Sequence, residues 1–349
     1  MTVRTPEIAC QKCRQDFPRV GAIPVLMNRA EVAIGLWGQQ LNLITSQVPQ
    51  TKAGLQAEAH ADGITPSGTL RLESLARGVL DQAGDVVALM GPALPGAPRE
   101  GNGSGLPPAM RTPLKYIHYL YRDWAWQQAG HTENRDTLAA VREVTGGAAL
   151  GRTLVLGAGG CRLAYDLHKT CGATETAVVD IDPFLFVFAE AVVRGRSVRL
   201  TESTANVQEA ASVARAWTLA APDGAIADDV FHFFLANGIE PTFADGTFDT
   251  VVTPWFIDQV PPDLPAFLAR VARLLAPGGR WLNLGPLLYP PEAAMSKRHS
   301  REEVFELAAA AGLTVHKWTA ASRPYLVSPL NGRGKVEWVM TFVASRAAV

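Results

Sequence analysis

The chain has 349 residues, of which 48% are hydrophobic and 19% are charged. This length suffices for one large domain and a smaller region. The net charge of −1 gives no general attraction to nucleic acid. No apolar run is long enough for a membrane-spanning helix, the start of the chain lacks a signal-peptide core, and four cysteines do not make a disulfide framework. We therefore expect a cytoplasmic protein with reduced thiols, no nucleic-acid partner and no membrane association.

The N-terminal segment has the ligand spacing of a zinc ribbon at Cys10-x-x-Cys13. The following Phe17–Leu26 resembles the second half of the small ribbon in the Trm112-like family. A tetrahedral zinc site needs four ligands, and no second cysteine pair follows nearby. Two interpretations stay open. Either Cys10 and Cys13 bind zinc, or residues 1–33 are a ribbon remnant that keeps its hairpin without metal. A homodimer that pools two cysteines from each chain would be a further way to reach four ligands.

The next region, residues 34–109, is expected to be helical and to end in a linker. Apolar periodicity predicts helices over 30–46 and 67–82. The segment 91–108 is rich in proline and glycine, which favours a loop or linker. A further helix is predicted over 116–129, at the start of a domain spanning 110–349.

A glycine turn between two buried strands is the most informative pattern of the chain. Leu154-Val-Leu156 reads as a strand covered on both faces, and Gly157-Ala158-Gly159 allows a sharp turn into a helix. Asp180 ends the next strand about 20 residues later, where an acid can accept hydrogen bonds from ribose hydroxyls. Arg162 stands where a dinucleotide fold has its third glycine. The pattern therefore favours the looser nucleoside site of S-adenosylmethionine-dependent methyltransferases.

The second half of the sequence completes the same α/β pattern. A strand is predicted from Phe248, a helix over 264–275 that stops at Pro277-Gly-Gly279, and another strand from Arg280. Together these elements predict a class I, Rossmann-like fold with a mostly parallel seven-stranded sheet, plus the small N-terminal ribbon-like and helical region.

The chain resembles the carnosine N-methyltransferase family from about Lys115 to Ala344. The motifs that carry the resemblance are Arg122-Asp-Trp124, Phe256-Ile-Asp258, Leu275-Ala-Pro-Gly-Gly279 and Trp281-Leu-Asn-Leu-Gly-Pro-Leu-Leu-Tyr289. The resemblance implies an enzyme that uses S-adenosylmethionine to methylate an imidazole nitrogen of a small, histidine-containing molecule.

The resemblance also assigns site residues. Arg122 matches an arginine that contacts the methionine carboxylate of the cofactor, and Asp258 matches an aspartate that contacts the substrate. Tyr289 and Tyr325 complete the expected catalytic group. The residues expected to bind the cofactor are Tyr119, Arg122, Gly157, Ala158, Gly159, Arg162, Asp180, Ile181, Asn237, Gly238 and Pro254.

The chain departs from the family at one cofactor-side position, beside the adenine, and at two substrate-side positions. Asn237-Gly238 stands where the family has an aspartate and a phenylalanine, Pro290 follows Tyr289 in place of a histidine, and a C-terminal tyrosine is replaced within Lys335–Trp338. A different imidazole or amine acceptor, a protein or nucleic-acid substrate, and an inactive binding protein stay open as alternatives. Asp258 could instead cap the following helix, and Asp182 the helix after Asp180.

Overall fold

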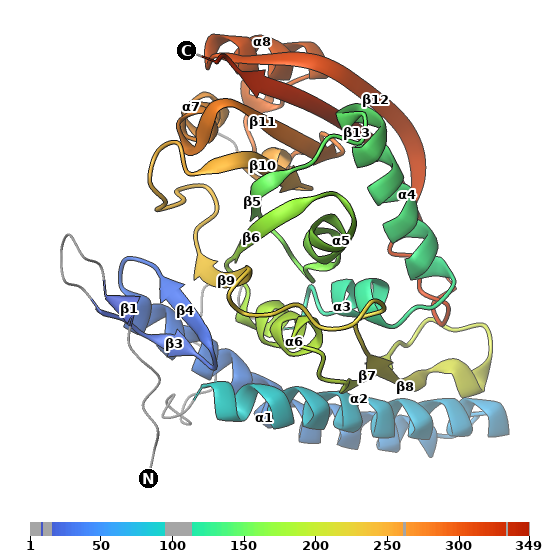
Figure 1. Ribbon diagram of the computed structural model, residues 1–349. Coiled ribbons are helices and arrows are strands. Elements are labelled where there is room, and N and C mark those ends of the chain that lie inside the picture. Colours follow the sequence, from blue (N-terminus) through green and yellow to red (C-terminus); the bar gives the residue numbers. More distant parts are fainter. Residues whose placement is uncertain (1–7, 10–15, 95–113, 261–262, 333, 349) are drawn as a thin grey trace. The chain divides into compact units, whose positions relative to one another are not determined.

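The computed structural model describes residues 8–9, 16–94, 114–260, 263–332 and 334–348 (Figure 1). These fall into two compact units. The helical unit comprises 1–131, 182–225 and 326–334, and the sheet unit comprises 132–181, 226–325 and 335–349. Cys10 and Cys13 lie outside the described residues, as does most of the predicted linker.

The sheet unit is built on seven strands in the order β12-β13-β11-β10-β5-β6-β9 (Figure 1). The pairs from β11 to β9 are parallel, whereas β13 is antiparallel to both of its neighbours. This confirms the predicted mostly parallel α/β sheet. The strands are β5 Gly151–Leu156, β6 Ala173–Asp180, β9 Phe231–Ala236, β10 Phe248–Pro254, β11 Leu275–Gly285, β12 Leu313–Tyr325 and β13 Lys335–Arg346.

The central strands follow from their composition. Leu154, Val155 and Leu156 of β5 are fully buried, as are Val251 and Val252 of β10. Residues that are apolar in an unbroken run suit a parallel strand with both faces covered. Because the interiors of these strands are apolar, the polar groups concentrate at their carboxyl ends, where open α/β sheets bind ligands.

Four helices belong to the sheet unit: α4 Ala129–Thr145 (from Thr132 onward), α5 Arg162–Thr170, α7 Leu264–Leu274 and α8 Arg301–Ala310. Helix α5 packs against β6, α7 against β10 and β11, and α8 against β12 and α7. The predicted helix over 264–275 is confirmed as α7, whose buried face carries Leu264, Phe267, Leu268 and Val271. A capping box between Ser300 and Glu303 starts α8. Short 3-10 turns lie at η3 Ile257–Gln259 and η4 Met295–Lys297.

The helical unit pairs two long helices with a small hairpin. Helices α1 and α2 pack together, and α2 also contacts the β7–β8 hairpin. Both predicted helices are confirmed and are longer than expected from the periodicity. The elements are β1 Ile8–Ala9, β2 Asp16–Phe17, β3 Arg19–Val20, β4 Ile23–Leu26, α1 Ala30–Ala59, α2 Pro66–Ala93, α3 His118–Trp124, α6 Pro183–Val193, β7 Val198–Ser203, η2 Ala210–Ser212 and β8 Ala214–Leu219.

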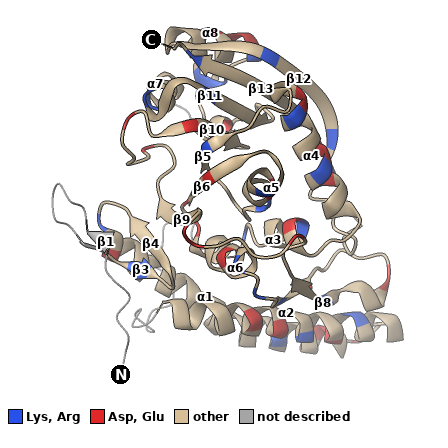
Figure 2. Cartoon of the chain, in the orientation of Figure 1, with Lys and Arg blue, Asp and Glu red and all other residues tan. Residues whose placement is uncertain are grey.

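Charges alternate in sign along the longer helices. Lys and Arg are interspersed with Asp and Glu on α2 and α4 (Figure 2). No described helix is long and apolar enough to cross a membrane.

The helix predicted over 116–129 is interrupted, because Trp126 is drawn into the core. Trp126 is 2% exposed, and its backbone N–H donates to the Tyr121 carbonyl, which ends α3. Its indole Nε1 donates to Glu202 Oε2 at 2.9 Å. The sequence periodicity alone could not show this interaction, because Glu202 is distant in the chain.

Glu202 is a buried carboxylate that joins three separate segments of the helical unit. Besides Trp126, the Trp217 Nε1 donates to its Oε2 at 2.8 Å and the Ser328 hydroxyl to its Oε1 at 2.6 Å. The three donors in these contacts are neutral groups. Each of them would lose its acceptor if the Glu202 carboxylate were removed.

We expect Glu202→Ala to lower the free energy of unfolding by about 2–5 kcal/mol, because two buried indole N–H groups lose their acceptor. Urea unfolding followed by tryptophan fluorescence measures this loss. Glu58→Ala, on an exposed position of α1, is the control. Equal unfolding midpoints for the two variants would show that Glu202 does not stabilise the unit.

Candidate cofactor and acceptor site

The turn after β5 has the backbone conformation that its glycines permit. Gly157 and Gly159 have φ of 71° and 55°, in the left-handed region that side chains disfavour. The N–H groups of Gly157 and Ala158 donate to the Val179 carbonyl at 2.9 and 3.1 Å. The turn is thereby fixed to the end of β6, which carries Asp180.

Asp180 closes this turn through its carboxylate. Its Oδ2 accepts from the Gly159 N–H at 2.8 Å and its Oδ1 from the Ile181 N–H at 2.7 Å. A carboxylate has about four acceptor positions, so these bonds leave capacity for hydroxyl donors. Ile181 is 59% exposed beside it. Asp182 instead accepts from the Phe184 N–H at 2.8 Å, which confirms the predicted cap of α6.

The ring of Phe256 lies against the glycine turn. A Cβ atom at Gly157 would come within 2.4 Å of Phe256 Cδ2, and one at Gly238 within 2.9 Å of Phe256 Cζ. Only residues without side chains fit at both positions. Phe256 therefore joins the loops that follow β5, β9 and β10.

We expect Gly157→Ala to destabilise the protein by about 2–4 kcal/mol, because the methyl group adds a clash with Phe256 to the cost of a left-handed backbone. Gly159→Ala is the matched control: its backbone is equally left-handed, but nothing lies within 4 Å of the new Cβ, so we expect about 1 kcal/mol. Urea unfolding measures both. The clash is disproved if the two variants lose the same stability, or if Phe256→Ala restores nothing to Gly157→Ala.

The remaining cofactor residues of the sheet unit have their own local contacts. The exposed Asn237 uses its Oδ1 to accept from the Ile239 N–H at 3.1 Å, while Pro254 is buried at the end of β10. Arg162 is 9% exposed and its Nε donates to Asp166 at 2.8 Å within α5.

Tyr119 and Arg122 belong to the helical unit. The Arg122 guanidinium lies 5.2 Å from the centre of the Tyr119 ring, and its Nε donates to Asp123 Oδ1 at 2.7 Å. Asp123 is 2% exposed, so Arg122 is held by a buried carboxylate rather than a surface one. The Tyr119 ring also stacks on Tyr116 with centroids 5.9 Å apart.

The predicted catalytic aspartate is buried at the carboxyl end of β10. Asp258 is 3% exposed, and its oxygens accept from the Leu288 N–H at 3.2 Å and from Gln259 Nε2 at 3.3 Å. Burial raises the pKa of Asp258 to about 6, against the effect of these two bonds, and the negative charge of Glu337 adds to the rise. Helix α7 takes Asp263 as its N-cap residue, so the alternative that Asp258 caps this helix is wrong.

The two predicted tyrosines reach the same region from other strands. Tyr289 follows β11, directly after the Leu288 amide that holds Asp258, and its ring meets His299 edge-on with centroids 6.2 Å apart. Burial raises the pKa of Tyr289 to about 12, and the charge of Asp258 contributes. Tyr325 ends β12 and stacks on Trp255, with centroids 5.4 Å apart and planes 18° apart.

Sequence reasoning missed two members of this group, Trp255 and Glu337. The indole Nε1 of Trp255 donates to Glu337 Oε2 at 2.9 Å. Trp255 has φ of 48°, which is unfavourable for a bulky residue. Glu337 lies in the segment where the chain departs from the family, but the register of β13 that aims it at Trp255 cannot be read from the sequence.

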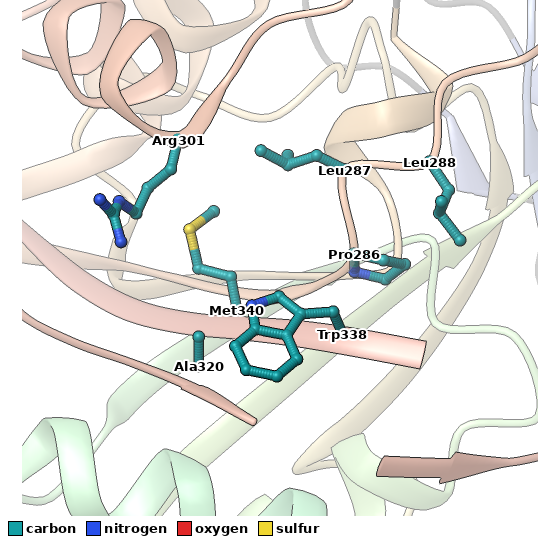
Figure 3. Close-up of a pocket in the computed structure, with 7 residues that line it drawn as sticks. All are labelled: Pro286, Leu287, Leu288, Arg301, Ala320, Trp338 and Met340. Atoms are coloured by element: carbon teal, nitrogen blue, oxygen red, sulfur yellow. The ribbon is translucent and has the colours of Figure 1, made fainter. Parts of the chain in front are cut away.

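An apolar cavity of about 300 Å³ opens beside the loop that holds Asp258 (Figure 3). Leu288 takes part in both features, since its N–H holds Asp258 and its side chain lines the cavity. Arg301 is the single charged residue of the wall, and its guanidinium stacks on Trp318 at 4.1 Å. The lining residues are Pro286, Leu287, Leu288, Arg301, Ala320, Trp338 and Met340.

Within the described ranges, no group of three or more His, Cys, Asp or Glu residues could hold a metal ion. The predicted ligands Cys10 and Cys13 lie outside those ranges, so the zinc interpretation has no support here.

The pKa of Asp258 predicts how stability depends on pH. Since the folded value of about 6 exceeds the ordinary 3.8, the folded state holds a proton that the unfolded state releases between these values. We expect unfolding free energy to fall by about 2 kcal/mol, attributable to this group, as pH rises from 4 to 7. Asp258→Asn should remove that part of the slope.

Urea unfolding at several pH values measures the difference between Asp258→Asn and the unmodified protein. Asp263→Asn, at the exposed start of α7, controls for loss of a carboxylate. Parallel curves for the protein and the Asp258→Asn variant would contradict the assignment.

The fold and the turn together define a class of protein. A parallel sheet with one antiparallel strand inserted between β11 and β12, a glycine turn after β5 and an acid ending β6 are the features of the class I methyltransferase fold.

Comparison with known proteins shows a resemblance to one family over part of the chain. The model of the carnosine N-methyltransferase family matches residues 210–331. A carnosine N-methyltransferase from Dictyostelium discoideum is 35% identical over 54 residues, which are 16% of this chain and 11% of the relative. The predicted resemblance to this family is therefore confirmed over residues 210–331, a segment that contains Asp258, Tyr289 and Tyr325.

Solved structures are similar only at a distance. A methyltransferase from Aquifex aeolicus has a TM-score of 0.40 and 11% identity, covering 68% of this chain and 98% of its own. Another from Methanosarcina mazei has a TM-score of 0.40 and 14% identity, covering 58% and 94%.

Proposed function

We propose that the protein is an S-adenosylmethionine-dependent methyltransferase that methylates a nitrogen of a small molecule, an imidazole or histidine-derived compound in the first instance. The observation that carries the proposal is the placement of Phe256 and Asp258. In one loop, Phe256 packs on the glycine turn and, two residues later, Asp258 is buried with a raised pKa. A glycine turn of the kind that binds nucleosides and a carboxylate with a raised pKa thus lie at one edge of the sheet.

The residues of the turn fit the proposed cofactor. Gly157 and Gly159 keep side chains away from a ligand that approaches the backbone, and Asp180 retains acceptor capacity for ribose hydroxyls. The resemblance assigns the methionine carboxylate to Arg122, whose guanidinium fork suits such a group. When bound, the cofactor would supply an electrophilic methyl group on its sulfonium.

The protein side of the reaction is positioning and proton handling. A neutral imidazole nitrogen is already a nucleophile, so the enzyme needs to orient it and exclude water. Asp258 can accept a hydrogen bond from the far N–H of the ring, which fixes the tautomer with its lone pair toward the methyl group. With a pKa of about 6, its carboxylate is ionised at neutral pH and can take up a proton as the ring becomes charged.

We expect Asp258→Ala to leave S-adenosylmethionine affinity within about twofold while lowering turnover at least about 100-fold, since general acid–base groups contribute about 10²–10⁴. Asp180→Ala should instead weaken cofactor binding at least about tenfold, because a charge-assisted hydrogen bond contributes about 1.5–3 kcal/mol. Calorimetric titration with S-adenosylmethionine and S-adenosylhomocysteine measures affinity, and a methyl-transfer screen on histidine-containing small molecules measures turnover.

The two variants separate the cofactor role from the acceptor role. Equal loss of affinity and turnover in Asp258→Ala would reject its assignment to the acceptor. Failure of the unmodified protein to bind either ligand would reject the proposed activity and favour the inactive binding protein.

A further inference from the structure

We infer that Asp258, Glu337, Trp255 and Tyr325 form an acceptor site selective for small molecules that carry a positive charge near the methylated nitrogen, with Glu337 as the specificity-determining residue. The inference rests on the proposed function. It adds a substrate class and a residue outside the segment that the family model matches, which ends at 331.

The first observation is a pair of carboxylates without a cation. Among the described residues, the donors that hydrogen-bond Asp258 are neutral, namely the Leu288 and Asp258 amides and the Gln259 side chain, and Glu337 accepts the neutral indole of Trp255. In the described part of the chain no Lys, Arg or His lies within 4.0 Å of either carboxylate. The two carboxylates are close enough for the charge of Glu337 to disfavour ionisation of Asp258.

Arg323, one candidate cation on the neighbouring strand, is directed elsewhere. Arg323 lies opposite Glu337 in the β12–β13 register. Its Nη1 donates to the Asp136 carbonyl of α4 at 3.1 Å instead. A cationic ligand would therefore be attracted by both carboxylates, whereas an anionic ligand would be repelled by them.

The second observation is the aromatic pair beside the carboxylates. Trp255 and Tyr325 stack at 5.4 Å, and Trp255 also donates to Glu337. Aromatic rings with a neighbouring carboxylate suit organic ammonium groups, because ring faces and carboxylates both attract positive charge. The two carboxylates and the two aromatic rings are therefore chemically matched to a cation.

The third observation is that the backbone is strained to make this arrangement. Trp255 has φ of 48°, its N–H donates to the Leu284 carbonyl at 2.6 Å, and a Cβ at Gly285 would come within 3.0 Å of Trp255 Cα. Such strain persists where surrounding contacts impose it, and it concentrates at functional sites. The strained turn aims the indole at Glu337, so Trp255 acts as a positioning residue for that carboxylate.

The test compares ligands that share a ring and differ in charge. One set is histamine, 4-methylimidazole and imidazole-4-acetate, and a second is N-phenylethylenediamine, N-ethylaniline and N-phenylglycine, whose neutral aniline nitrogen covers amine acceptors. Binding to the protein saturated with S-adenosylhomocysteine is measured by calorimetry, and methyl transfer from S-adenosylmethionine is measured in parallel. We expect the cation of at least one set to bind at least tenfold more tightly than the matched anion.

Variants then identify the residue that is responsible for the preference for cations. Glu337→Gln should lower cation affinity at least tenfold, change neutral-ligand affinity less than twofold and leave S-adenosylhomocysteine affinity unchanged. Trp255→Phe keeps a ring to stack but loses the hydrogen bond, so it should lower the cation-to-neutral ratio by a smaller factor. Glu306→Gln, exposed on α8, is the control and should change nothing.

The outcomes separate this inference from the proposed function. S-adenosylhomocysteine binding without a cation preference in either set, or a preference that survives Glu337→Gln, overturns the inference and leaves the methyltransferase proposal standing. If the unmodified protein does not bind S-adenosylhomocysteine, the proposed function is overturned. In that case, the same ligand sets titrated without cofactor still decide whether Glu337 selects a cation.

Discussion

The packing of Phe256 on two glycines is the contact on which the candidate site depends. Its ring fills the space that side chains at Gly157 and Gly238 would occupy. The loops after β5, β9 and β10 are thereby held together at one edge of the sheet. On one side of Phe256 the chain makes the strained turn at Trp255, and on the other it buries Asp258. Both sides of the proposed reaction are therefore positioned by one aromatic ring.

The buried carboxylates of Glu202 and Asp258 differ in how well their hydrogen bonds compensate their burial. Glu202 accepts from three side chains at 2.6–2.9 Å, distances typical of full hydrogen bonds to a carboxylate. Asp258 accepts at 3.2 and 3.3 Å, one at the upper end of the usual range for N–H donors and one just beyond it. Because its hydrogen bonds are weak, burial dominates and the pKa rises. A carboxylate compensated this poorly gains from a ligand that donates a proton or carries positive charge.

The sequence predicted the elements that depend on neighbouring residues. Unbroken apolar runs identified β5 and β10, the periodicity of 264–274 identified α7, and the spacing from Gly157 to Asp180 identified the turn. Contacts between residues far apart in the chain could not be predicted from the sequence. The break between α3 and α4 depends on Trp126 reaching a carboxylate 76 residues away, and the role of Glu337 depends on Trp255, 82 residues away. No local pattern contains either pairing.

The segment that the family model matches contains Asp258 but not Glu337. The matched segment, 210–331, contains Asp258 and the Leu288 amide that holds it, whereas Glu337 lies beyond. Methyl transfer to nitrogen requires an aligned lone pair and an acceptor for the proton, and these needs hardly change between related amines. Charge recognition of the rest of the acceptor can be altered by one carboxylate on a neighbouring strand. A chain that keeps the first group and changes the second would keep its reaction while changing its substrate.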